Sequence, residues 1–243
     1  MSSHNEFLPL KNGIAAVAVL GFSLLPLGAQ AAILDDFNRA DGPIGASWTN
    51  QSGSCSVVSN QATCSGVGIT TINGGTGTTV EADVFHNGSS DDYIALILGY
   101  ADAANNLYIK LQSQDGVQGF NNYAFYFGTN GSNSGAWAGS GFFNLNASFT
   151  SAHMIVSLVG TTLTLSLDTA FDNTPDQIYS NSTVPVGLLG TGVGMGGWTG
   201  SGLSGATLDN FAASAAGIPE PASLALLGLG LAGLAVTRRR KAA

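Results

Sequence analysis

Positive charge is almost missing from the central part of this 243-residue chain. Between Ala32 and Gly217 the only cations are Arg39 and Lys110, against thirteen acidic residues, so the net charge of this segment is near −11. A surface that binds nucleic acid or an anionic membrane needs the opposite sign. We therefore expect no nucleic-acid partner, and an acidic surface that suits a soluble protein outside the cell.

The short motifs that mark common catalytic sites are also missing. The chain has no Gly-x-Ser-x-Gly elbow, no P-loop and no His-Glu-x-x-His pair. His153 begins an apolar run and has no obvious Ser or Cys partner. We therefore expect no catalytic residues and a protein that is not an enzyme.

Helical periodicity is nearly absent between residues 32 and 216. Short runs rich in Val, Ile, Thr, Tyr and Phe are separated by Gly and Asn about every ten residues, which is typical of strands. Thirteen or so strands in one domain imply two packed antiparallel sheets. The sequence predicts an all-β sandwich over residues 32–216. Its clearest strands are Thr78–His86, Tyr93–Tyr100, Asn106–Gln112, Asn122–Phe127, His153–Val159 and Thr162–Leu167, the last two joined by a hairpin turn at Gly160-Thr161.

The two ends of the chain have a different composition. Lys11 precedes an apolar stretch broken by Pro26, and Ala29-Gln30-Ala31 offers small residues where a signal peptidase reads. Residues 1–31 are therefore predicted to be a secretory signal peptide, so signal peptidase is an expected partner.

The chain has only two cysteines, and export would bring them to an oxidising compartment. A turn centred on Ser59-Asn60 would set Cys55 opposite Cys64 as a non-hydrogen-bonded pair, with Cα atoms about 4.5 Å apart. This spacing permits a disulfide. A metal pair or a reactive thiol would need His or acidic partners that nothing nearby supplies. We expect a disulfide between Cys55 and Cys64.

The last 27 residues, Gly217 to Ala243, combine three features. Pro219-Glu220-Pro221 is held extended because each proline disfavours helix at the residue before it. The apolar run 222–237 is about 24 Å long as a helix, shorter than the ~30 Å hydrocarbon core. The basic tail 238–241, with Arg238, Arg239 and Arg240, would stay in the cytoplasm. A short transmembrane helix of this kind fits a transient stop, and an ordinary single-pass anchor is the alternative.

This tail closely resembles the PEP-CTERM sorting signal of Gram-negative bacteria, also catalogued as the ice-binding protein C-terminal domain. The resemblance implies recognition by an exosortase, an inner-membrane intermediate, and delivery to the cell surface or extracellular matrix. Ice binding itself is not supported, because no Thr-x-Thr ladder repeats at fixed spacing. Association with exopolysaccharide or biofilm is the function we expect.

The central segment resembles concanavalin A-like, laminin-G-like jelly rolls of secreted bacterial proteins. The opening Asp36–Trp48 and the closing Gly205–Phe211 carry this resemblance, together with the stretch from Tyr93 to Leu111. Related jelly rolls pair the first and last strands and often hold a structural calcium there. If a metal is present, we therefore expect calcium. It would be bound by Asp36, Asp209 and Asn210.

Two further functions remain open. Glu81 and Asp83 resemble the active strand of concanavalin-fold glucanases, but Phe85 and His86 stand where the third carboxylate should fall, which argues against a glycoside hydrolase. A lectin-like carbohydrate-binding module is the stronger alternative, because jelly rolls bind glycans through aromatic rings and amides. The candidate rings are Tyr123, Tyr126, Trp137 and Trp198, with Asn121, Asn122 and Asp102 as polar partners.

Overall fold

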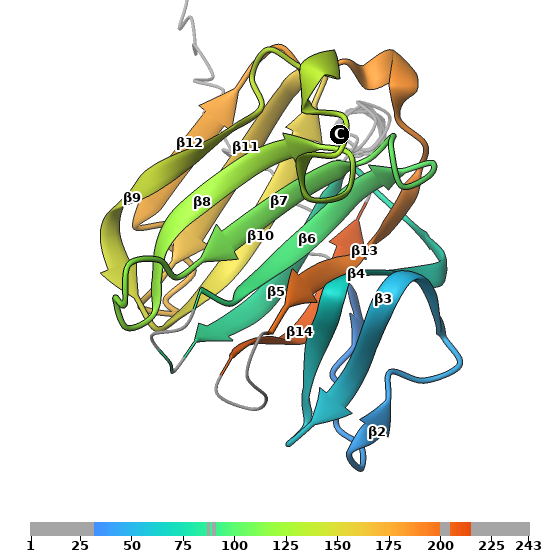
Figure 1. Ribbon diagram of the computed structural model, residues 1–243, viewed down its shortest axis with the longest axis vertical. Helices are drawn as coiled ribbons and strands as arrows, with labels where there is room; N and C mark the ends of the chain where they lie inside the picture. Colours follow the sequence, from blue (N-terminus) through green and yellow to red (C-terminus); the bar gives the residue numbers. More distant parts are fainter. Residues whose placement is uncertain (1–31, 87, 89–90, 200–204, 215–243) are drawn as a thin grey trace, which may run out of the picture.

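The structure is a computed structural model that describes residues 32–86, 88, 91–199 and 205–214. The predicted signal peptide and sorting tail lie outside these ranges. The described residues form fourteen strands and three short 3-10 turns, and no α-helix (Figure 1). None of them forms a helix with the length and hydropathy that crossing a membrane would require.

The strands follow one another along the chain with short connections. They are β1 (Ala32–Asp35), β2 (Gly42–Pro43), β3 (Trp48–Val58), β4 (Gln61–Thr76), β5 (Thr79–His86), β6 (Tyr93–Tyr100), β7 (Leu107–Gln112), β8 (Phe120–Phe127), β9 (Gly141–Phe149), β10 (Ser151–Val159), β11 (Thr162–Asp168), β12 (Gln177–Asn181), β13 (Gly192–Trp198) and β14 (Ala206–Ser214). The 3-10 turns are η1 (Thr129–Gly131), η2 (Ser134–Ala136) and η3 (Val186–Leu188).

The strands form two packed layers, as predicted, in a jelly-roll-like antiparallel sandwich (Figure 1). One layer has the order β12-β11-β10-β5-β14 and the other the order β13-β6-β7-β8-β9. The layers are one continuous hydrogen-bonded sheet rather than two separate sheets, because the 16-residue β4 pairs with both β14 and β13. The first strand, β1, pairs with the last, β14.

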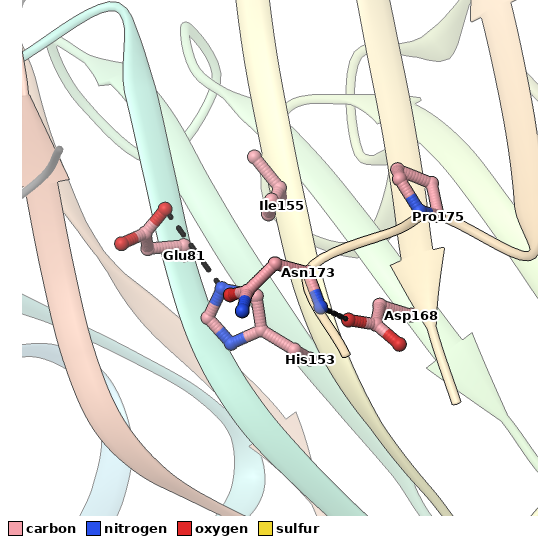
Figure 2. A pocket seen from close by; sticks show the side chains of 6 residues that line it. All are labelled: Glu81, His153, Ile155, Asp168, Asn173 and Pro175. Atoms are coloured by element: carbon pink, nitrogen blue, oxygen red, sulfur yellow. Dashed lines mark hydrogen bonds and ion pairs between the residues drawn. The ribbon is translucent and has the colours of Figure 1, made fainter. Parts of the chain in front are cut away.

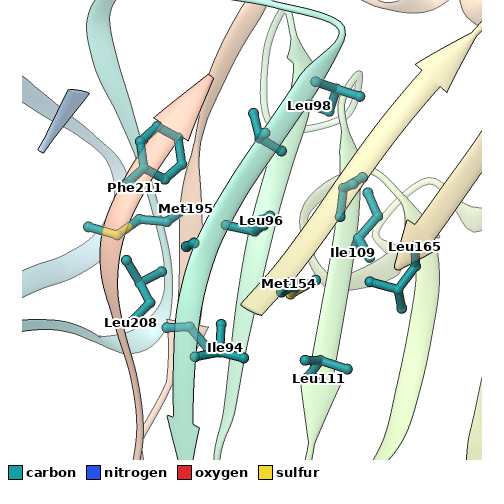
Figure 3. Close-up of a cluster of buried hydrophobic side chains, with 14 of the residues drawn as sticks. Ile94, Leu96, Leu98, Ile109, Leu111, Met154, Leu165, Met195, Leu208 and Phe211 are labelled. Atoms are coloured by element: carbon teal, nitrogen blue, oxygen red, sulfur yellow. The ribbon is translucent and has the colours of Figure 1, made fainter. Parts of the chain in front are cut away.

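The core lies between the layers and follows from strand alternation. In β5, Val80, Ala82 and Val84 are buried while the residues between them are partly exposed. In β6 nearly every residue is buried, since aromatic side chains also cover its outer face. Figure 3 shows core side chains from both layers: Ile94, Leu96, Leu98, Ile109, Leu111, Met154, Leu165, Met195, Leu208 and Phe211.

Two predicted hairpins and the disulfide are confirmed. Ser59 and Asn60 both have positive φ, the conformation that a two-residue turn between β3 and β4 requires. This turn places Cys55 directly opposite Cys64, and the two are bonded with Cα atoms 4.0 Å apart. Gly160, at φ 59°, turns β10 into β11 as expected.

The end strands of the two layers, β9 and β12, are linked by side chains. The backbone N–H of Asn146 donates to the Tyr179 hydroxyl at 2.8 Å and to Gln177 Oε1 at 3.1 Å. In return, Gln177 Nε2 donates to the Ala147 carbonyl at 3.1 Å. The Tyr179 ring also stacks on Tyr123, with ring centroids 4.2 Å apart. Polar side chains of β12 therefore satisfy backbone groups of β9.

Candidate functional site

The outer face of β5 carries the acidic pair that the sequence singled out. Alternation turns Glu81 and Asp83 outward, as predicted, because their neighbours enter the core. Phe85 occupies the third position on this face, and His86 points to the opposite side, where it is fully buried against Phe120. A third carboxylate is therefore missing from the active-strand pattern, as the sequence indicated.

A histidine from the neighbouring strand completes this face. β10 pairs with β5 so that His153 lies directly opposite Asp83. His153 Nδ1 is 2.7 Å from Asp83 Oδ1, and its Nε2 is 3.9 Å from Glu81 Oε2. Asn210 Nδ2, from β14, donates to the other oxygen of Asp83 at 2.7 Å. Both Asp83 oxygens are thus engaged.

These contacts fix the charge state of the group. The hydrogen bond to Asp83, together with the nearby carboxylate of Glu81, raises the pKa of His153 to about 9, although burial opposes the shift. Burial alone would raise the pKa of Asp83, but the hydrogen bonds from His153 and Asn210 lower it overall. At neutral pH the ring is therefore an imidazolium held by carboxylates, and it is not available as a general base.

A cavity of about 450 Å³ opens beside this group (Figure 2). Its walls come from β5, β10, the end of β11 and the loop that leads to β12. The Asp168 carboxylate accepts hydrogen bonds from the backbone N–H groups of Ala170, Asp172 and Asn173, and these bonds hold the loop between β11 and β12 in place. The lining residues are Glu81, His153, Ile155, Asp168, Asn173 and Pro175.

We expect the stability of the domain to depend on this histidine between pH 6.5 and 9. Since the folded pKa of about 9 exceeds the ordinary 6.5, the stabilisation is complete below pH 6.5 and is lost as pH rises through 9. The ring is partly open to solvent, so the loss should be roughly 1–2 kcal/mol.

The measurement is urea unfolding at about pH 6 and about pH 9.5 for the wild type and for His153→Gln. Lys110 also titrates in this window, with a pKa lowered to about 8 by burial, so only the difference between the two proteins isolates His153. An equal pH dependence in both proteins would contradict the assignment.

The residues expected to bind calcium lie near one another, where β1 meets β14. Burial, together with the neighbouring carboxylates of Asp83, Asp36 and Asp35, raises the pKa of Asp209. The Asn210 side chain is engaged with Asp83. In the part of the chain that the structure describes, no three His, Cys, Asp or Glu side chains are grouped to hold a metal. A calcium ion here would depend on carbonyl and water oxygens, and it stays a prediction.

The acid that organises the opening motif is Asp35, which sequence reasoning missed. Its carboxylate accepts hydrogen bonds from Arg39 Nη1 and Nη2, at 2.7 and 2.9 Å, and from Trp48 Nε1 at 2.6 Å. It also accepts the Phe37 backbone N–H at 2.8 Å. The resemblance to jelly rolls began one residue later, at Asp36, which is exposed and accepts the backbone N–H of Asn38.

The aromatic candidates divide between the two faces of their layer. Tyr126 and Trp198 lie on the outer face, partly exposed, and pack around the buried Tyr93. Trp198 stacks on Tyr93 with ring centroids 6.4 Å apart. Lys110 Nζ lies 4.3 Å from the centroid of Tyr93 and 5.3 Å from that of Tyr126, and it donates to Asn130 Oδ1.

The structure corrects the expectation for Tyr123 and Trp137. Tyr123 lies three residues before Tyr126, so alternation turns it into the core, where it stacks on Tyr179. Trp137 is 2% exposed, and its Nε1 donates to the Thr183 hydroxyl. Neither ring offers a face to a ligand.

The polar candidates lie in three different settings. Asn122 is buried on the same outer face as Tyr126. Asn121 instead holds the loop before β8, through two hydrogen bonds with the backbone of Gln114. Asp102 is exposed and closes a turn with Ala104 and Asn105. Of the three, only Asn122 shares the outer face with the partly exposed rings of Tyr126 and Trp198.

Comparison with known proteins identifies the tail. Residues 217–241 match the family model described as the PEP-CTERM protein-sorting motif, which confirms the resemblance over about a tenth of the chain. Such a motif indicates export and sorting to the surface of a Gram-negative bacterium by an exosortase. The search of curated proteins found no match.

Solved structures share the fold at low sequence identity. The GH43 BlXynB protein from Bacillus licheniformis is 12% identical over 73% of this chain and 38% of that chain, with a TM-score of 0.51. The carbohydrate binding module CBM66 from Bacillus subtilis is 16% identical over 70% of this chain and 94% of that chain, with a TM-score of 0.46. The first likeness supports the sandwich fold and does not extend to activity.

Proposed function

Starting from the sorting motif at residues 217–241, we propose that this is an exported, non-catalytic surface or matrix protein that binds extracellular polysaccharide. Export would begin with removal of residues 1–31 by signal peptidase. An inner-membrane intermediate held by the tail would follow. The exosortase would then release the domain to the cell surface or matrix.

The observation that carries polysaccharide binding is the pair of partly exposed rings on one outer face. Tyr126 on β8 and Trp198 on β13 are three strand spacings apart across the layer, roughly 14 Å, and the register places Tyr126 four residues further along the strands, roughly 13 Å. Sugars stack on such rings through their C–H faces and take hydrogen bonds from neighbouring amides. The exposed Asn144 lies opposite Asn122 on this face and supplies an amide.

The state of the β5 face supports a non-catalytic role. A retaining glycosidase needs two carboxyl groups about 5 Å apart, one of which donates a proton. Asp83 is held ionised by His153 and Asn210, which leaves Glu81 without a second free carboxyl group. The exported protein should therefore release no reducing sugar from β-glucans. A sustained release that Glu81→Gln abolishes would instead favour a hydrolase.

Replacing the indole on the outer face should weaken polysaccharide binding. We expect Trp198→Ala to bind host exopolysaccharide about tenfold more weakly, because a stacking surface is lost. The measurement is binding of the purified exported protein to immobilised polysaccharide. Phe171→Ala removes an exposed ring from the β11–β12 loop, outside this face, and is the matched control. Equal binding by both variants, or no binding by the wild type, would contradict the proposal.

A further inference from the structure

The cavity beside His153 lies on the other layer, away from the aromatic face. It combines two kinds of wall. Ile155 from β10 and Pro175 from the loop before β12 provide an apolar side. Glu81, His153, Asp168 and Asn173 provide polar groups (Figure 2). It is a half-open hollow of about 450 Å³, a volume that is usual for small-molecule sites, and its lining is more polar than that of most such sites.

The polar groups differ in how fully they are already engaged. Asp168 is held by three backbone N–H groups, and both oxygens of Asp83 are bonded. Glu81 has only a long contact, 3.9 Å, with His153 Nε2. That distance exceeds a hydrogen bond, so the Glu81 carboxylate keeps acceptor positions that a ligand can use.

Charge then decides the class of ligand. Glu81 and Asp168 line the cavity and Asp83 is bonded to His153 beside it, so three carboxylates outnumber the single imidazolium and the surroundings of the cavity are net negative. The rest of the segment 32–217 adds to this negative potential, since it contributes ten further acids and only two cations, Arg39 and Lys110. Such a field attracts cations and repels acidic sugars.

We propose that this cavity is a second ligand site, which binds a sugar unit carrying a protonated amino group. The ammonium pairs with the Glu81 carboxylate, and the C–H face of the ring packs on Ile155 and Pro175. The site extends the proposed function by naming a class of polysaccharide, one with free amino groups. It does not depend on the aromatic face.

The test uses the exported protein and two matched probes, a glucosamine tetrasaccharide and its fully N-acetylated counterpart. Titration calorimetry near pH 6 should detect binding of the glucosamine form, with at least about tenfold weaker binding of the acetylated form, because acetylation removes the charge. Binding of the glucosamine form should weaken as salt concentration rises. Equal binding of the two probes, or no binding of either, would overturn the proposal.

Three variants locate the site. Glu81→Gln should weaken binding of the glucosamine probe about tenfold. Ile155→Lys, which places a competing ammonium at the cavity wall, should weaken it at least as much. Asp115→Asn removes the same charge from an exposed turn between β7 and β8 and should leave it unchanged. Melting curves establish that each variant is folded. Unchanged binding by both folded cavity variants would overturn the proposal.

Trp198→Ala separates this site from the aromatic face. We expect this variant to keep full affinity for the glucosamine probe while it loses affinity for exopolysaccharide. Loss of both ligands in Trp198→Ala would overturn the cavity assignment while leaving the polysaccharide function in place. If Glu81→Gln lost exopolysaccharide binding and Trp198→Ala kept it, the result would instead contradict the function proposed for the aromatic face.

Discussion

Full-length chains should accumulate at the inner membrane when Pro219-Glu220-Pro221 is replaced by three alanines. From the sequence we expect the two prolines to disfavour helix at the triplet, whereas alanines would favour extension of the predicted helix 222–237 through it. The exosortase would then lack its extended recognition segment. We expect nearly complete loss of surface delivery, which cell fractionation and intact-mass analysis in the native host would measure.

The wild type provides the comparison for this experiment. Its exported form should lack Arg238 to Ala243, because we expect the exosortase to remove the basic end. The Lys241→Ala variant, which keeps the triplet and the three arginines, is the matched control and is expected to be sorted normally. Recovery of wild-type chains that are membrane-bound and still carry the basic end would favour an ordinary anchor.

Asp35→Ala should cause a large loss of stability in the domain. The substitution leaves the Arg39 guanidinium, the Trp48 indole N–H and the Phe37 N–H without their shared acceptor. Loss of a partly buried, charge-assisted network of this kind should cost roughly 2–3 kcal/mol. For a domain of this size that corresponds to a fall of about 5–10 °C in melting temperature.

Asp36→Ala is the matched control, because it removes the adjacent acid, which is exposed. It should shift the melting temperature by only a degree or two in the absence of calcium, about 0.5 kcal/mol. Equal losses in the two variants would contradict the role given to Asp35. The carboxylate contribution is present above the ordinary pKa of 3.8 and disappears as pH falls through the lowered folded value, so the difference should vanish in acid.

Features that depend on neighbours in sequence were predictable here. The two-residue turns at Ser59-Asn60 and Gly160-Thr161 fix the register of their hairpins, so the disulfide followed from counting outward from a turn. The outward position of Glu81 and Asp83 followed from alternation alone. Such inferences need no knowledge of where distant strands lie.

Features that depend on distant strands were not predictable. His153 meets Asp83 across a separation of 70 residues, through the register of β10 on β5, which no local pattern encodes. The sequence did not indicate that the Tyr123 side chain points into the core, because β8 is buried on both faces and its sequence shows no polar-apolar alternation. Asp35 was overlooked since its partners, Arg39 and Trp48, meet only when the opening loop folds back.

The link between β9 and β12 covers part of a strand edge that would otherwise be open to other copies of the domain. An unpaired strand edge is a template onto which another copy can add a strand, and repeated addition leads to fibres. Because Gln177 and Tyr179 occupy the Asn146 N–H and the Ala147 carbonyl, this stretch of β9 is closed to such addition. The domain can therefore be packed closely on a surface without its copies joining edge to edge at this stretch.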